Sequence, residues 1–112
     1  SEGPASELEL NASGAVAFSG DTIRAWDADG HELMAPIRGV SAPPLLSRDT
    51  LYFGTVSGEL VAWRIGPPPP AKTGSAALGD VASARPLLAG GFLYIGTRGG
   101  KLVKLDPAKL SP

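Results

Sequence analysis

The chain has 112 residues and a mass of 11.4 kDa, so it makes one small domain or part of a larger one. Hydrophobic residues make up 43% of it, and its 15 glycines and 11 prolines favour short strands joined by turns over a helical bundle. The net charge of −1, the lack of cysteine and the single histidine argue against a nucleic-acid footprint, a disulfide scaffold and a multi-histidine site. No apolar run approaches the roughly 20 residues of a membrane span.

The first predicted unit covers about residues 7–38. It contains two strands, at residues 16–20 and 22–27, and an outer strand at residues 31–35 after an Asp29-Gly30 turn. These short apolar runs bounded by turn residues are typical of a β-sheet.

The second predicted unit covers about residues 41–79. A strand begins at Pro44, where a missing backbone donor is tolerated, and further strands follow at residues 51–55 and 59–64. After the proline run at residues 67–70, an outer strand is expected around residues 74–78.

The third predicted unit, residues 83–112, repeats the second at an offset of 42. SAPPLL at residues 41–46 matches SARPLL at 83–88, LYFGT matches LYIGT, and GELV matches GKLV, all in one ungapped register. The first unit is a weaker copy, aligned at offsets of 35 and then 37, which implies a turn two residues shorter. The chain therefore holds about three units of 35 to 42 residues.

The repeated motif resembles a known family. YFGTxxGxLxAW at residues 52–63 and YIGTxxGxLxxLD at 94–106 resemble the quinoprotein, or pyrroloquinoline-quinone-like, β-propeller repeat, as does the WDADG turn at 26–30. The resemblance implies an all-β chain of antiparallel four-stranded blades, about 2.5–3 of them, forming a partial propeller. The structural positions of the repeat are Trp26, Tyr52, Gly54, Gly58, Trp63, Tyr94, Gly96 and Gly100. Both tryptophans are expected to pack in the cores between neighbouring blades.

Membership of this family would not by itself imply catalysis. Its enzymes are alcohol and glucose dehydrogenases with a cofactor, a calcium site, a catalytic carboxylate and often a vicinal cysteine pair, and no residue here matches those positions. Residues 27–32 superficially resemble a calcium loop but lack the distal bidentate glutamate, so a hairpin turn is expected, with His31 on the surface. We therefore assign no catalytic, cofactor-binding or metal-binding residue and expect no enzyme activity.

Three units are too few to close a ring and leave open sheet edges. Either they belong to a longer propeller or several copies assemble. The sequence therefore favours a binding or scaffold module for protein partners in the bacterial periplasm or cell envelope, without a nucleic-acid partner. The partner surface expected from the sequence comprises Arg48, Arg98, Pro67 and Pro68. One alternative is a piece of a quinoprotein oxidoreductase whose cofactor site lies in other blades, and another is a unit that self-assembles into a complete ring.

Overall fold

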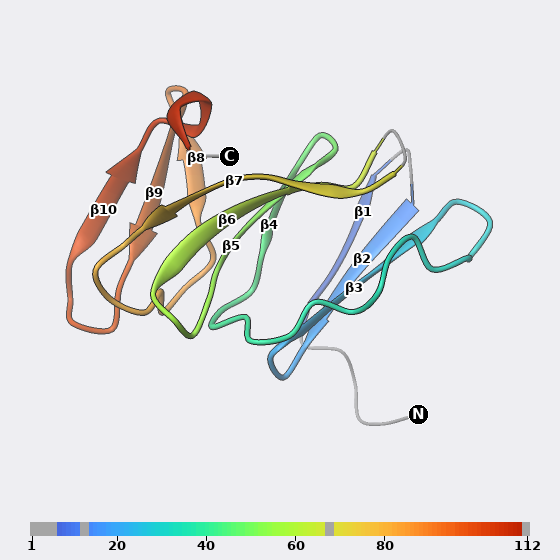
Figure 1. Ribbon diagram of the computed structural model, residues 1–112, viewed down its shortest axis with the longest axis horizontal. Coiled ribbons are helices and arrows are strands. Elements are labelled where there is room, and N and C mark those ends of the chain that lie inside the picture. The colour runs from blue at the N-terminus through green and yellow to red at the C-terminus, as the bar shows by residue number, and fades with distance from the viewer. Residues whose placement is uncertain (1–6, 12–13, 67–68, 111–112) are drawn as a thin grey trace.

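The computed structural model describes residues 7–11, 14–66 and 69–110. This part of the chain forms three antiparallel sheets that stand side by side (Figure 1). We call them blade 1 (β1–β3), blade 2 (β4–β7) and blade 3 (β8–β10), and the all-β fold expected from the sequence is confirmed. The strands are β1 Glu7–Asn11, β2 Gly14–Ser19, β3 Thr22–Asp27, β4 Leu45–Ser47, β5 Thr50–Gly54, β6 Glu59–Arg64, β7 Ala71–Ala77, β8 Leu87–Ala89, β9 Phe92–Gly96 and β10 Leu102–Leu105, followed by the 3-10 helix η1 Pro107–Lys109.

Blade 2 is the blade with four regular strands, in the order β4-β5-β6-β7. Its outer strand β7 starts earlier than expected, at Ala71, because the chain becomes extended soon after the proline run. Blade 3 has the same first three strands and, in the described residues, no fourth strand. Its chain turns instead into η1, which Asp106 caps by accepting a hydrogen bond from the Ala108 backbone N–H at 3.0 Å.

The offset of 42 between blades 2 and 3 holds for individual hydrogen bonds. The Thr55 N–H donates to the Glu59 carbonyl at 2.8 Å, and the Thr97 N–H donates to the Lys101 carbonyl at 2.9 Å. In both turns the threonine hydroxyl accepts the returning N–H at 3.2 Å. The fourth residue of each turn is glycine with φ near +87°, a left-handed conformation that side chains disfavour. The duplication is therefore a structural repeat.

Blade 1 has a first strand, β1, that was not expected, and it departs from the sequence-based expectations in its outer strand and its register. Residues 31–35 form no regular strand, because this segment touches β3 only through isolated bridges at Glu32 and Ile37. The alignment at offset 35 is also wrong by one residue. The pair Phe18 and Ile23 of blade 1 corresponds to the pair Gly54 and Leu60 of blade 2. The offset is therefore 36 for β2 and 37 for β3, and the β2–β3 turn is one residue shorter than the β5–β6 turn. A slip of one residue matters because it would move every side chain of β2 to the opposite face.

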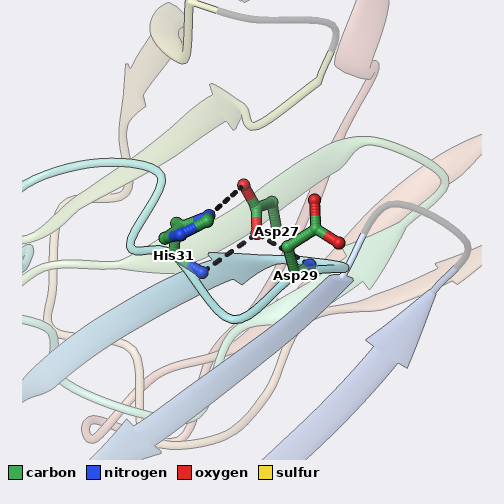
Figure 2. Close-up of side chains that lie close together, drawn as sticks. All are labelled: Asp27, Asp29 and His31. Atoms are coloured by element: carbon green, nitrogen blue, oxygen red, sulfur yellow. Dashed lines mark hydrogen bonds and ion pairs between the residues drawn. The ribbon is translucent and has the colours of Figure 1, made fainter.

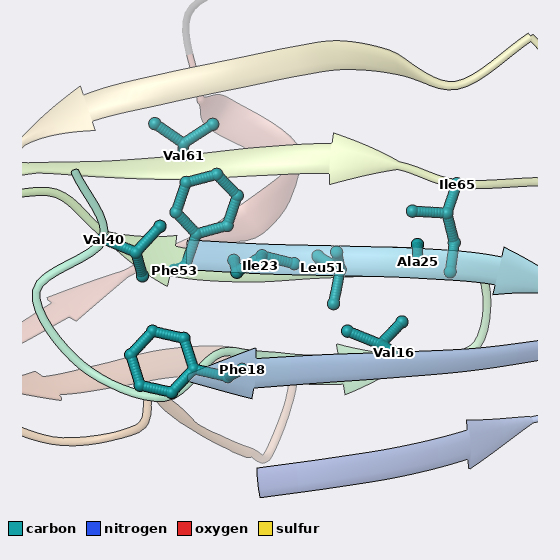
Figure 3. Packing of buried hydrophobic residues seen from close by; sticks show 9 residues of the cluster. All are labelled: Val16, Phe18, Ile23, Ala25, Val40, Leu51, Phe53, Val61 and Ile65. Carbon is teal, nitrogen blue, oxygen red and sulfur yellow. The ribbon is translucent and has the colours of Figure 1, made fainter. Parts of the chain in front are cut away.

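Two apolar cores lie between the blades. The larger joins blades 1 and 2 and includes Phe18 and Ile23 from one side and Leu51 and Phe53 from the other (Figure 3). The smaller joins blades 2 and 3 around Leu60, Leu78, Ala82, Leu93 and Ile95. Blade 2 is thus covered on both faces, which explains why β6 reads as a nearly continuous apolar run.

Candidate binding surface

The face that blade 2 turns toward blade 3 shows how a covered blade face is built here. Leu45 and Tyr52 pack against the smaller core, and Leu60 is fully buried in it. These three residues lie on neighbouring strands and point the same way, because Leu45 pairs with Tyr52 and β5 pairs with β6. A face that is covered by the next blade therefore has a buried Leu60 flanked by half-buried Leu45 and Tyr52.

Blade 3 carries the same face without a cover. The residues 42 positions further on are Leu87, Tyr94 and Leu102, and Leu87 and Leu102 are 63% and 69% exposed. Such large exposed aliphatic side chains on one sheet face are unusual for a surface that only meets water. We call this set, Leu87, Tyr94 and Leu102, the open face of blade 3.

One position on the open face differs in kind from its counterpart on blade 2. Lys104 occupies the place of the buried Ala62, and its ammonium group lies 4.2 Å from the centre of the Phe92 ring and 6.0 Å from that of Tyr94. The lysine thus covers part of the aromatic surface while its charge stays in solvent. The open face is therefore apolar, with a cation on its outer strand β10.

Blade 1 has an outward face of a different composition. Trp26 and Arg24 lie on it, opposite the buried side chains of Ile23 and Ala25. Trp26 is half-buried and belongs to neither core, whereas Trp63 packs against the larger core, so the expected interblade packing holds for one of the two tryptophans. The Arg24–Glu32 ion pair at 3.7 Å is exposed and contributes little to stability.

Two aspartates tie the blade linkers to the hairpin turns. Asp80, just before blade 3, accepts hydrogen bonds from the backbone N–H groups of Val81 and Gly99, both at 2.7 Å. Asp21, in the β2–β3 turn, accepts from the Thr22 hydroxyl at 3.0 Å and from the Gly39 N–H at 3.2 Å. These bonds favour the charged carboxylates and lower the pKa of both aspartates below the usual 3.8.

The lowered pKa of Asp80 predicts acid sensitivity of the fold. A carboxyl group whose pKa falls on folding stabilises the native state at neutral pH, and that contribution is lost as the pH drops through the folded pKa, below about 4. We expect Asp80→Asn to destabilise the chain at pH 7 and to flatten the decline of its urea midpoint between about pH 5 and pH 2. Asp29→Asn, which changes an exposed carboxylate, is the control. Parallel acid declines in wild type and Asp80→Asn would contradict the prediction.

The cluster of Asp27, Asp29 and His31 is a turn in the structure (Figure 2). One carboxylate oxygen of Asp27 accepts the backbone N–H groups of Asp29 at 2.9 Å and of His31 at 3.0 Å, and the other lies 3.6 Å from His31 Nδ1. The backbone bond from His31 is the main cause of the lowered pKa of Asp27. The turn has the same hydrogen bonds as Thr55–Glu59, and His31 is exposed, as expected.

A shallow hollow of about 530 Å³ lies beside the β5–β6 turn, lined by residues 56–59, Ala77 and residues 79–81. Glu59 and Asp80 are the acidic residues among those that line it. Since Asp80 is already engaged by two backbone N–H groups, the hollow offers few free polar groups to a ligand.

The residues expected to meet a partner are not gathered together. Arg48 is in the β4–β5 turn with φ +56°, and Arg98 is in the β9–β10 turn, at the opposite end of its blade. Arg98 lies close enough to Asp80 to lower its pKa. Pro67 and Pro68 lie outside the described residues. The arginines therefore form no joint surface.

Sequence reasoning missed the open face itself. The signal was present in the offset of 42, because Leu87, Tyr94 and Leu102 repeat residues that a blade interface requires. What was lacking was the knowledge of which face of each strand meets the next blade. The other repeat positions, Gly54, Gly58, Gly96 and Gly100, sit at strand ends and turns.

Comparison with solved structures supports the propeller assignment. BamB from Moraxella catarrhalis matches with a TM-score of 0.70 at 19% identity, over 89% of this chain and 31% of that chain. The computationally designed Ika4 protein matches with a TM-score of 0.66 at 15% identity, over 88% and 63%. BBS1N, solved in complex with ARL6DN, matches with a TM-score of 0.65 at 13% identity, over 98% and 39%.

These likenesses establish the fold class, a partial β-propeller, since BamB and the designed protein are propellers. The chain spans between 31% and 63% of the length of these structures. No protein-family model matches the sequence, and no curated protein matches it. In the described residues, no helix is long and apolar enough to cross a membrane.

Proposed function

We propose that this chain is a non-catalytic binding or scaffold module whose blades hold a protein partner in the bacterial cell envelope. The open face of blade 3 carries the proposal. Its residues repeat Leu45, Tyr52 and Leu60, which are packed in an interblade core, yet Leu87 and Leu102 remain largely exposed. Aromatic and aliphatic side chains of this kind form the centre of protein interfaces.

The envelope location and the non-catalytic role have their own support. The repeat resembles that of quinoprotein-like propellers, a largely bacterial and often extracytoplasmic group, and BamB of Moraxella catarrhalis shares the fold. BBS1N, another structure with this fold, was solved in complex with a second protein. The lack of a match to the catalytic positions of the dehydrogenases favours binding over chemistry.

Self-assembly into a ring is the less favoured role. If blade 3 of one copy packed on blade 1 of the next as blade 2 packs on blade 3, Lys104 and Arg24 would enter the same interface. Like charges in a desolvated interface are costly, and Arg24 replaces a valine found at the same position in blades 2 and 3.

The proposal is tested by photocrosslinking from position 87 in the native cells, followed by binding of the purified captured protein. We expect Leu87→Asp to weaken that binding at least about tenfold, because it places a charge in an apolar contact. Val56→Asp is the matched control, since Val56 is 59% exposed but lies in the β5–β6 turn. Equal binding by all three chains would refute the role of the open face. Calcium-dependent binding of pyrroloquinoline quinone would instead support the oxidoreductase alternative.

A further inference from the structure

The outer edge of blade 3 is an uncovered strand. In the described residues β10 pairs with β9 on one side and with nothing on the other, whereas its counterpart β6 is covered by β7. In blade 1 the same edge is partly covered through the bridges at Glu32 and Ile37. An unpaired edge presents a row of backbone donors and acceptors that another strand can join.

The backbone groups available on this edge follow from the neighbouring bonds. The Thr97 N–H donates to the Lys101 carbonyl, so Thr97 and Lys101 form a hydrogen-bonded pair. Because such pairs alternate along an antiparallel ladder, the backbone N–H and C=O groups of Leu102 and Lys104 point away from β9. In blade 2 the Gly58 carbonyl accepts the N–H of Leu78 at 2.8 Å, at the start of the β6–β7 pairing. Gly100 is the equivalent acceptor beside β10.

The charge of the edge differs from that of its covered counterpart. Glu59 and Ala62 of blade 2 are replaced in blade 3 by Lys101 and Lys104, both exposed. Residues 101–109 contain three cations and one acid, a net charge of 3 − 1 = +2 in a chain whose total is −1. The one acid, Asp106, is engaged in capping η1. Lysines on an edge repel most incoming strands, but they favour one that carries carboxylates opposite them.

We propose that β10 binds an acidic, extended segment of a protein partner, which adds as the fourth strand of blade 3. The register is that of β7 on β6, so the residue opposite Lys104 takes the place of Gly74, which pairs with Ala62. The other positions copy the small residues of β7, Ser75 and Ala76, opposite Val103 and Leu102. This inference rests on the proposed function and names the chemistry of the partner.

The probe is a synthetic peptide of residues 69–79 with Gly74→Glu, added to the intact 15N-labelled chain. We expect slowed amide exchange at Leu102 and Lys104 and a dissociation constant about two- to fivefold lower than for the Gly74→Lys peptide at low salt. The difference should shrink as salt is added. A Gly74→Glu peptide that also carries Ala76→Pro should bind more weakly, because the N–H of residue 76 is the one that would donate to the Leu102 carbonyl.

A charge exchange makes the result specific. In a Lys104→Glu chain the order of the two peptides should reverse, whereas Lys109→Glu, the same charge change outside β10, should preserve it. Equal affinities of the two peptides would overturn the proposal, as would amide chemical-shift changes confined to Leu87 and Tyr94. Slow amide exchange of β10 in the chain without peptide, together with the mass of a dimer, would also overturn it, because a second copy would then occupy the edge.

Failure of this proposal can be told apart from failure of the proposed function. Leu87 lies on β8, separated from β10 by β9, so Leu87→Asp should leave peptide binding unchanged. If the peptides do not bind β10 but the captured protein still depends on Leu87, strand addition is wrong and the binding module stands. If the captured protein also ignores Leu87→Asp, both are wrong.

Discussion

Phe53→Ala is expected to lower the free energy of unfolding by about 3–5 kcal/mol, the range found when a large buried aromatic side chain is deleted. Phe53 is 2% exposed and lies in the core between blades 1 and 2, close to Phe18 and Val61 (Figure 3). Small domains are stable by only about 5–15 kcal/mol, so this one change removes a large part of the total. Urea unfolding followed by the fluorescence of Trp26 and Trp63 measures it.

Val56→Ala is the control for the Phe53 prediction. Val56 is exposed in a turn, so its truncation should change the unfolding free energy by no more than about 0.5 kcal/mol. If Phe53→Ala does not fold, Phe53→Leu gives a smaller loss in the same direction. A loss below about 1 kcal/mol for the alanine variant would mean that blades 1 and 2 do not pack as described.

Gly54→Ala is expected to destabilise the chain by about 1–3 kcal/mol, because added volume in a close contact forces the backbone to move. A methyl group on Gly54 would clash with Cβ of Ala82, which belongs to the linker into blade 3, and would lie 3.1 Å from the Ser41 hydroxyl. Ala82 is fully buried, so the clash cannot be relieved by moving into solvent.

Gly96 offers a matched control because it holds the same repeat position one blade later. The nearest neighbour of a methyl group there is the Ser83 hydroxyl at 4.0 Å, an ordinary contact. Gly96→Ala should therefore be neutral or stabilising by up to about 1 kcal/mol, since alanine restricts the unfolded chain. Thermal unfolding of both variants measures the contrast, and equal effects would show that blade 3 does not pack against Gly54.

The repeat also shows where prediction from sequence ended. Matching blocks at the offset of 42 located β4, β5, β6, β8, β9 and β10 to within about a residue, because each block carries its own turn glycines and alternating side chains. The weaker match of blade 1 located β2 and β3, but it gave the wrong register for β2 and did not find β1. Val16 and Leu51 are similar residues and therefore align in sequence, but the side chain of Val16 faces the following blade and that of Leu51 faces the preceding one.

Local sequence determined the strands, the turns and the number of repeats in this protein, because strand and turn preferences act over a few residues. The tertiary structure decided which repeated residues are covered. Tyr52 and Tyr94 have the same local environment in the chain, yet only the first lies against a core, since burial depends on whether a further blade stands beside the sheet. The partial propeller expected from the three repeats therefore has one exposed apolar face, the open face of blade 3, and its function is expected there.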